Sequence, residues 1–198
     1  MKPCDTESTK ATRLDLKSKI LLALAVPNGL IFVTFVALRL LGLIRPFYIP
    51  AASMTPAIAP GDHIMMEGLS YRAHKPHRGD ILFFSTVGLE ELPQDQIYVK
   101  RLAGKPGEHL QLSNGDLHVD GRLVTLSNAA GRIVYRWPQL SSAIPATQFD
   151  VPKTGYFVLG DNSTDSYDSR YWGSVPKENV LGRVWFCYWP LDRVGAVK

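Results

Sequence analysis

Residues 47–62 read FYIPAASMTPAIAPGD and separate a long apolar run from the first segments that have the pattern of β-strands. Pro50, Pro56 and Pro60 fix their own φ angles and disfavour a helical conformation in the residues before them. We therefore expect rigid, extended backbone here. Small neighbours leave the hydroxyl of Ser53 accessible, but a serine becomes a nucleophile only when a base takes its proton. An ordinary turn serine looks the same, so the base decides between the two interpretations.

The apolar run before this stretch is typical of a membrane-spanning helix. No charged residue stands between Ile20 and Leu38, and a helix of that length, at about 1.5 Å per residue, nearly spans a ~30 Å hydrocarbon core. We expect an anchor helix over residues 20–44. Pro46 and Pro50 crowd the place where a removable signal peptide would be cut, which disfavours that alternative.

Basic residues are more frequent before this run than after it: Lys2, Lys10, Arg13, Lys17 and Lys19 precede it, and Arg39 and Arg45 follow. By the positive-inside rule, residues 1–19 are a cytoplasmic tail and residues 45–198 an extracytoplasmic domain. The lipid bilayer is then an expected partner. The net charge of +4 comes largely from the tail, and no basic stripe with interleaved aromatic residues indicates a nucleic-acid partner. Cys4 and Cys187 would lie on opposite sides of the membrane, which excludes a disulfide between them.

Short strand patterns fill the domain, over residues 64–66, 80–84, 97–102, 109–112, 117–119, 122–125, 156–159 and 180–189. Asn114-Gly115 and Asp120-Gly121 are strong signals for tight hairpin turns. Residues 126–155 have no clear pattern, and we expect a surface excursion. The fold class is therefore mainly β, a compact antiparallel barrel-like domain with one N-terminal transmembrane helix.

Lysine is a better base for Ser53 than any of the five histidines, none of which has the context of a catalytic triad. In a strand over 97–102, Lys100 shares a side with Tyr98 and Leu102, which are apolar. Desolvation there would lower the lysine pKa from its reference of ~10.4 towards the neutral form that a base needs. On residue type alone, a surface lysine beside Arg101 is the alternative. No ligand spacing predicts a metal, and we expect no cofactor.

Residues 160–175, GDNSTDSYDSRYWGSV, form a third polar segment. Ser166 could orient a neutral lysine by a hydrogen bond, and Asp168 and Arg170 can pair and brace the loop. A calcium loop is disfavoured because the glycine and terminal glutamate of an EF-hand are missing.

Together these segments resemble the type I signal peptidases, a family of Ser/Lys proteases, over nearly all of residues 46–190. The matching motifs, in order, are IPAASMTP at 49–56, RGDI at 78–81, YVKRLAGKPGE at 98–108, and GDN at 160–162 with SYDSRYWG at 166–173. The resemblance implies a nucleophilic Ser53 and a general base at Lys100. It implies removal of signal peptides from exported preproteins by cleavage after Ala-X-Ala-like ends, in a bacterial inner membrane facing the periplasm.

The resemblance also implies substrate pockets and departures from the family pattern. The pockets would accept small side chains and would be shaped by Phe47, Ile49, Pro50, Met54, Ile58 and Val99. By strand alternation, Val99 faces away from Lys100. Many relatives have a serine two residues before the nucleophile as a second oxyanion donor, where this chain has Ala51. Ser163 stands where an arginine often follows Gly-Asp-Asn.

Three interpretations stay open. The first is a general processor of preproteins, with the secretion translocon as a candidate partner. The second is a processor dedicated to one substrate, such as a conjugative pilin precursor. The third is an inactive membrane-anchored paralogue that binds peptides, which the presence of both Ser53 and Lys100 disfavours and Ala51 keeps open.

Overall fold

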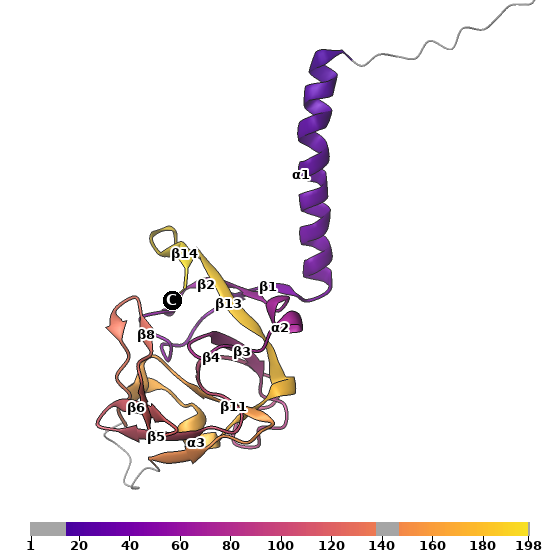
Figure 1. Ribbon diagram of the computed structural model, residues 1–198. Coiled ribbons are helices and arrows are strands. Elements are labelled where there is room, and N and C mark those ends of the chain that lie inside the picture. Colours follow the sequence, from indigo (N-terminus) through magenta and orange to yellow (C-terminus); the bar gives the residue numbers. More distant parts are fainter. Residues whose placement is uncertain (1–14, 138–146, 198) are drawn as a thin grey trace, which may run out of the picture. The chain divides into compact units, whose positions relative to one another are not determined.

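The computed structural model describes residues 15–137 and 147–197, in two units, Met1–Leu41 and Gly42–Lys198 (Figure 1). The first unit contains the helix α1 (Leu16–Leu40), capped by Asp15, whose carboxylate accepts a hydrogen bond from the Ser18 N–H at 2.7 Å. Its 25 residues rise about 37 Å, and it is long and apolar enough to cross a membrane. The side chains of Asn28 and Thr34 donate to carbonyls one turn earlier, which reduces the number of unpaired donors along the apolar surface. Residues 1–14 of the expected cytoplasmic tail lie outside the described residues.

The regular structure of the second unit consists mostly of short strands. They are β1 (Ile44–Tyr48), β2 (His63–Glu67), β3 (Ile81–Ser85), β4 (Ile97–Gly104), β5 (His109–Ser113), β6 (Asp116–Val119), β7 (Arg122–Val124), β8 (Ser127–Asn128), β9 (Gly131–Arg132), β10 (Gln148–Asp150), β11 (Gly155–Leu159), β12 (Val175–Pro176), β13 (Val180–Trp189) and β14 (Gly195–Ala196). The short helices are α2 (Ser70–Ala73), α3 (Ser169–Trp172) and the 3₁₀ turns η1 (Ser163–Asp165), η2 (Lys177–Asn179) and η3 (Leu191–Arg193). The predicted mainly β fold class is confirmed.

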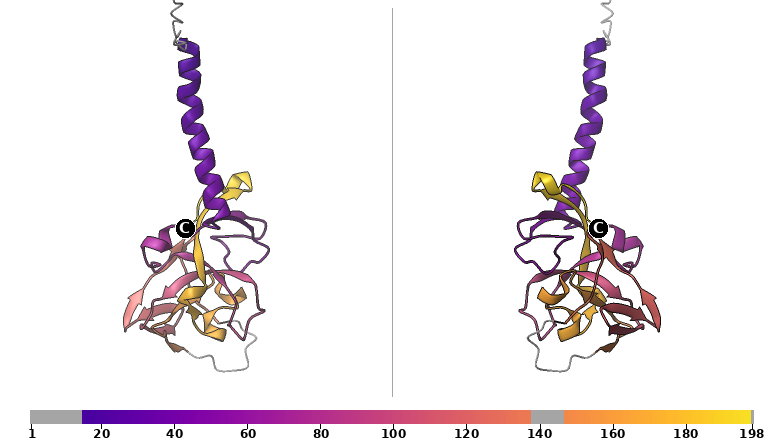
Figure 2. Two further views of the ribbon diagram at one scale, coloured as in Figure 1. Left: turned by 90° about the vertical axis from the view of Figure 1, so that its right-hand side faces the viewer. Right: turned by 90° about the vertical axis from the view of Figure 1, so that its left-hand side faces the viewer.

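The large sheet is antiparallel, with strand order β1-β2-β13-β3-β4-β11-β12 and β14 beside β13, and it curls into an open half-barrel (Figure 1). The long strand β13, near the C-terminus, lies between β2 and β3, so a segment made late in the chain completes the middle of the sheet (Figure 2). A second sheet has the order β10-β5-β6-β7, and β8 pairs with β9.

The two hairpins that the sequence predicted are confirmed. Asn114 and Gly115 have φ angles of 54° and 84°, and Asp120 and Gly121 have φ angles of 49° and 75°. Positive φ at both central residues gives a turn whose twist matches that of the flanking strands. These turns join β5 to β6 and β6 to β7.

The strands β3 and β4 are packed on both faces of the large sheet. On one face Leu82 and Phe84 join a core cluster with Leu102, and on the other Ile81 and Phe83 join a cluster that includes Met54. Because both faces are covered, side chains of either parity along β4 are removed from water. This burial decides the environment of Lys100.

The expectation of a surface excursion over residues 126–155 is wrong for much of that segment. Leu126, Ile133, Tyr135 and Val151 are buried in a third core cluster with Phe157. The strand β10 also extends the second sheet by pairing with β5. The segment has no regular periodicity because its apolar residues enter the core from irregular backbone. Residues 138–146 lie outside the described chain.

A close backbone approach in the middle of the sheet generates a stability prediction. A Cβ at Gly182 would overlap the backbone carbonyl of Glu67 on β2, and backbone cannot move aside cheaply. We expect Gly182→Ala to lower the free energy of unfolding by about 1–3 kcal/mol, as measured by denaturant titration of tryptophan fluorescence in detergent. Gly29→Ala is the control, because a Cβ there meets nothing within 4 Å. Equal stability of Gly182→Ala and the parent would contradict the packing described.

Candidate active site

Ser53 lies in the loop between β1 and β2, which the core and its own hydrogen bonds hold in place. Met54 and Ile58 are 2% and 0% exposed and fix the loop to the core, with a bond from the Ile58 N–H to the Met54 carbonyl at 2.9 Å. At the end of the loop, the Asp62 carboxylate accepts from the Ala59 N–H at 2.8 Å. The small residues between these fixed points leave Ser53 partly exposed, as the sequence predicted.

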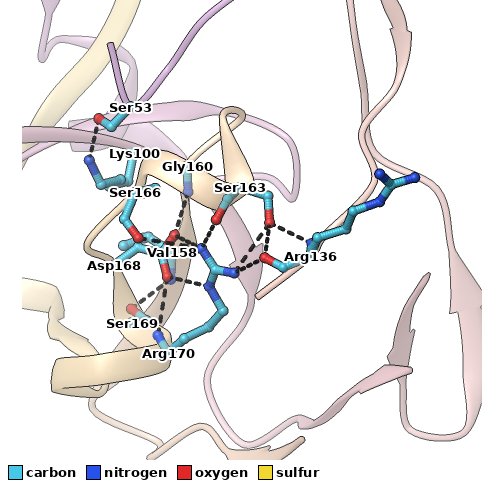
Figure 3. A network of polar contacts seen from close by, with 10 residues as sticks. All are labelled: Ser53, Lys100, Arg136, Val158, Gly160, Ser163, Ser166, Asp168, Ser169 and Arg170. Atoms are coloured by element: carbon cyan, nitrogen blue, oxygen red, sulfur yellow. Dashed lines mark hydrogen bonds and ion pairs between the residues drawn. The ribbon is translucent and has the colours of Figure 1, made fainter. Parts of the chain in front are cut away.

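Lys100 points from β4 directly at this serine. Its Nζ donates a hydrogen bond to Ser53 Oγ at 2.7 Å (Figure 3). Lys100 is only 5% exposed, and Tyr98, two residues earlier on the strand, has its ring centroid 5.9 Å from Nζ. The strand alternation expected from the sequence is thus what places the amine in an apolar environment.

Burial lowers the pKa of Lys100 to about 8, because desolvation disfavours the charged ammonium. Of the nearby charges, Asp168 raises this pKa, Arg170 lowers it and Asp165 raises it. A large fraction of the amine is therefore neutral at mildly alkaline pH and able to accept a proton from a hydroxyl.

The segment after β11 holds the loop of Ser53 from the other side. The N–H of Asn162 donates to the Ser53 carbonyl at 3.1 Å, and its side-chain amide donates to the Ala52 carbonyl at 3.2 Å. A Cβ at Gly160 would overlap both the Ser53 carbonyl and the hydroxyl of Ser166, so only glycine allows this approach. Sequence reasoning did not single out Asn162 or Gly160 as contacts of Ser53.

A buried ion pair ties this segment to β4. Arg101 donates to both carboxylate oxygens of Asp161 at 2.7 Å, and their side chains are 4% and 0% exposed. Arg101 also donates to the Gly79 carbonyl at 2.7 Å, and Asn128 donates to Asp161 at 3.1 Å. No role for Arg101 was predicted from the sequence, which placed it only beside Lys100. The available signal was the Gly-Asp-Asn segment at 160–162, which puts a carboxylate directly after β11, the strand that pairs with β4.

The other predicted support residues lie behind Lys100. Arg170 donates to the two carboxylate oxygens of Asp168 at 2.8 and 2.9 Å, and both side chains are fully buried. Asp168 in turn accepts from the Gly160 N–H at 2.9 Å. The Ser166 hydroxyl is buried and has no hydrogen-bond partner within the described residues, so the expected bond from Ser166 to Lys100 is not made here.

An open pocket of about 390 Å³ lies beside Ser53 and Lys100. All six residues predicted to shape the substrate pockets line it, namely Phe47, Ile49, Pro50, Met54, Ile58 and Val99. The remaining lining residues were not predicted: Tyr48, Ala51, Phe83, Gln96, Ile97, Tyr98 and Tyr167. Val99 and Lys100 both reach the pocket although they alternate along β4.

Comparison with known proteins adds the family. Residues 22–189 match the family described as "Signal peptidase, peptidase S26". The "Probable signal peptidase I-2" of Synechocystis is 37% identical over 151 residues, which are 76% of this chain and 65% of that protein. The "Signal peptidase I" of Leptolyngbya laminosa is 34% identical over 156 residues, 76% of this chain and 71% of that protein. A solved signal peptidase I from Enterococcus faecalis is 28% identical, with a TM-score of 0.41 over 56% of this chain and 97% of that one.

The pair of Arg101 and Asp161 generates a second stability prediction. Asp161→Asn leaves the guanidinium of Arg101 buried without a counter-charge, so we expect a loss of about 3–5 kcal/mol in the free energy of unfolding. The control is Asp150→Asn, whose carboxylate is 90% exposed and pairs with His109, and which should cost less than about 1 kcal/mol. Similar losses in the two variants, measured by denaturant titration, would show that breaking the buried pair costs no more stability than breaking an exposed one.

Proposed function

The chain belongs to the signal peptidase family, peptidase S26, and on that basis we propose that it is a membrane-bound serine endopeptidase that removes signal peptides from exported preproteins. In this proposal Ser53 is the nucleophile and Lys100 the general base. The observation that carries it is the 2.7 Å contact between Lys100 Nζ and Ser53 Oγ at a desolvated lysine.

The reaction has two halves. Neutral Lys100 accepts the proton of Ser53 as Oγ attacks the carbonyl carbon of the scissile peptide bond, and the resulting ammonium donates a proton to the departing amine. This leaves the signal peptide as an ester on Ser53. Lys100, neutral again, takes a proton from water, the hydroxide attacks the ester, and Ser53 recovers its proton.

The negative oxygen of the tetrahedral intermediate needs hydrogen-bond donors. We assign this role to the N–H of Ser53, which is free to take it because it makes no hydrogen bond within residues 15–137 and 147–197. Ala51 supplies no second hydroxyl donor, and one such donor is worth about 10²–10³ in rate. In this proposal the Ser53 N–H is the one assigned donor, and either a water or another group supplies the second hydrogen bond or the enzyme is slower by about that factor.

Ser166, Asp168 and Arg170 support the base. The ion pair of Asp168 with Arg170 keeps a carboxylate close to Lys100 without leaving its negative charge uncompensated. The buried Ser166 hydroxyl is available to hydrogen-bond to the amine while the proton moves.

The pocket favours small apolar side chains next to the scissile bond. Met54, Ile58 and Phe83 line it and are almost fully buried, so the wall that a substrate side chain would meet there is apolar and belongs to the core. We therefore propose cleavage after Ala-X-Ala-like ends, with Phe47, Ile49, Pro50, Met54, Ile58 and Val99 in contact with the signal peptide.

We further propose that α1 (Leu16–Leu40), rather than the full predicted span of residues 20–44, anchors the chain in a bacterial inner membrane, because Ile44 already belongs to β1. In this arrangement residues 1–19 are cytoplasmic, and residues 45–198 work on the extracytoplasmic side, where preproteins emerge from the translocon. The length and apolar surface of α1 and the excess of basic residues before it support this topology.

The test of the dyad is a cleavage assay with the full chain in detergent and a preprotein that has an Ala-X-Ala site. We expect one cut after the second alanine, identified by mass, and its loss in Ser53→Ala and in Lys100→Met, which keeps the bulk of the side chain. The exposed Lys75→Met is the control and should cleave like the parent. A preprotein with phenylalanine at the cleavage position should resist.

The outcomes separate the alternatives. Cleavage that survives in Ser53→Ala or Lys100→Met would contradict the dyad. Binding without cleavage by the parent would favour an inactive peptide-binding paralogue, and cleavage of a single preprotein among several unrelated ones would favour a dedicated processor.

The lysine pKa generates a prediction for pH dependence. Because only neutral Lys100 is a base, kcat/KM should rise as the pH rises through about 8 and level off above it. Below this pKa, each unit of pH should lower the rate about tenfold. The measurement is a pH–rate profile of kcat/KM between pH 6 and 11. An inflection close to the value of a free lysine would contradict a desolvated base.

A further inference from the structure

Ser163, at the start of η1, is the centre of a set of contacts that the proposed mechanism does not use. Its hydroxyl is buried; it accepts a hydrogen bond from the Arg136 N–H at 2.7 Å and donates to the Arg136 carbonyl at 2.7 Å (Figure 3). The same hydroxyl accepts from Arg170 at 3.2 Å. One serine hydroxyl thus joins a distant segment of chain to the arginine behind Lys100.

The guanidinium of Arg170 is enclosed by that segment. It donates to the Arg136 carbonyl at 2.8 Å and to the Ser163 carbonyl at 2.7 Å, besides its two bonds to Asp168. The ring centroid of Trp137 lies 5.2 Å from the guanidinium carbon, within the range of a cation–π interaction. These contacts hold the Arg170 side chain in one conformation, in which its guanidinium pairs with the carboxylate of Asp168.

The position of Arg170 matters because opposing charges face the amine of Lys100. The groups around it are Ser53, Tyr98, Asp165, Asp168 and Arg170, which come from the Ser53 loop, β4, η1, the residue before α3 and α3 itself. The two carboxylates favour the ammonium form, and of the charged groups only Arg170 opposes them. If Arg170 moved away, Asp168 would act on Lys100 uncompensated and the amine would hold its proton more tightly.

We propose that Ser163, the backbone of Arg136 and the ring of Trp137 form a clamp that positions Arg170, and through it Asp168, behind Lys100. The inference rests on the proposed Ser53/Lys100 dyad. Ser163 is a positioning residue, since it touches neither the substrate nor the reacting atoms. Many members of the family that this chain resembles have an arginine at the position of Ser163. Here the short serine side chain leaves room for the Arg136 peptide group, which supplies a carbonyl acceptor for Arg170.

The test measures the pKa of Lys100 directly, in the full chain in detergent, by NMR of ¹³C-labelled lysine side chains. The signal of Lys100 is assigned by its absence in Lys100→Met. In Ser163→Ala the clamp loses its hydroxyl, and we expect the pKa of Lys100 to rise by about 0.5–1 unit. The rate of cleavage at pH 7 should fall about three- to tenfold and recover at a pH above the new pKa.

Two variants control for the loss of a hydroxyl. Ser163→Thr keeps the hydroxyl and should keep the pKa of the parent. Ser70→Ala removes a hydroxyl that accepts a hydrogen bond from Arg183, which is paired with Glu67. This variant therefore makes the same change next to another arginine–carboxylate pair, outside the proposed active site. It should leave the pKa of Lys100 and the cleavage rate unchanged.

A Ser163→Ala variant that titrates like the parent, or that is slower by the same factor at every pH, would overturn the clamp and leave a merely structural serine. If Ser163→Ala shows no cooperative unfolding transition, Trp137→Leu replaces it, with a smaller rise in pKa expected and an unchanged pKa overturning the proposal. Absence of cleavage by the parent would contradict the proposed function instead, because the NMR titration of Lys100 does not depend on cleavage.

Discussion

The domain is built around one demanding contact, a primary amine held against a serine hydroxyl where water does not keep it charged. An amine in water stays protonated at physiological pH, so the fold must remove solvent without supplying a negative charge that restores the proton. The curled sheet removes the solvent, because β4 is covered on both faces near Lys100. The segment after β11 avoids an uncompensated negative charge, because it introduces the carboxylate of Asp168 together with its counter-ion, Arg170.

Two buried ion pairs fix the geometry around this contact, each at a different place. Arg101 with Asp161 joins β4 to the turn that touches the Ser53 loop, while Arg170 with Asp168 sits behind the amine. Buried pairs of this kind often add little net stability over apolar residues of equal volume, since desolvation offsets much of their attraction. Their value here is positional. Each guanidinium also binds a backbone carbonyl of a distant segment, so the loops that meet at Ser53 are held in one arrangement.

Much of the fold was predictable from local patterns, and the site partly so. The pattern of short strands and the two hairpins follow from alternation and from turn chemistry, which act over a few residues. Strand alternation placed Lys100 among apolar neighbours, and the resemblance to the signal peptidases then assigned it as the base. The contacts of Asp161 and Asn162 were not predicted, because their partners lie on β4 and in the Ser53 loop, and only the tertiary fold brings them together. The prediction of a surface excursion over residues 126–155 was wrong for a similar reason. Leu126, Ile133 and Tyr135 are buried by contacts that leave no periodicity in the sequence.

Lys100 and Arg101 are adjacent on one strand, point to opposite faces, and are both buried. A slip of β4 by one residue turns every side chain to the other face, because side chains alternate with a period of two. In one direction Arg101, whose guanidinium cannot release its proton in a protein, would take the place of Lys100 beside Ser53, and Leu102 would face the carboxylate of Asp161. In the other direction the amine of Lys100 would face Asp161, and Val99 would take the place of the base. Either shift removes the base from Ser53, and the first also buries a carboxylate without a counter-charge, so the order of these two cations ties activity to the register of β4.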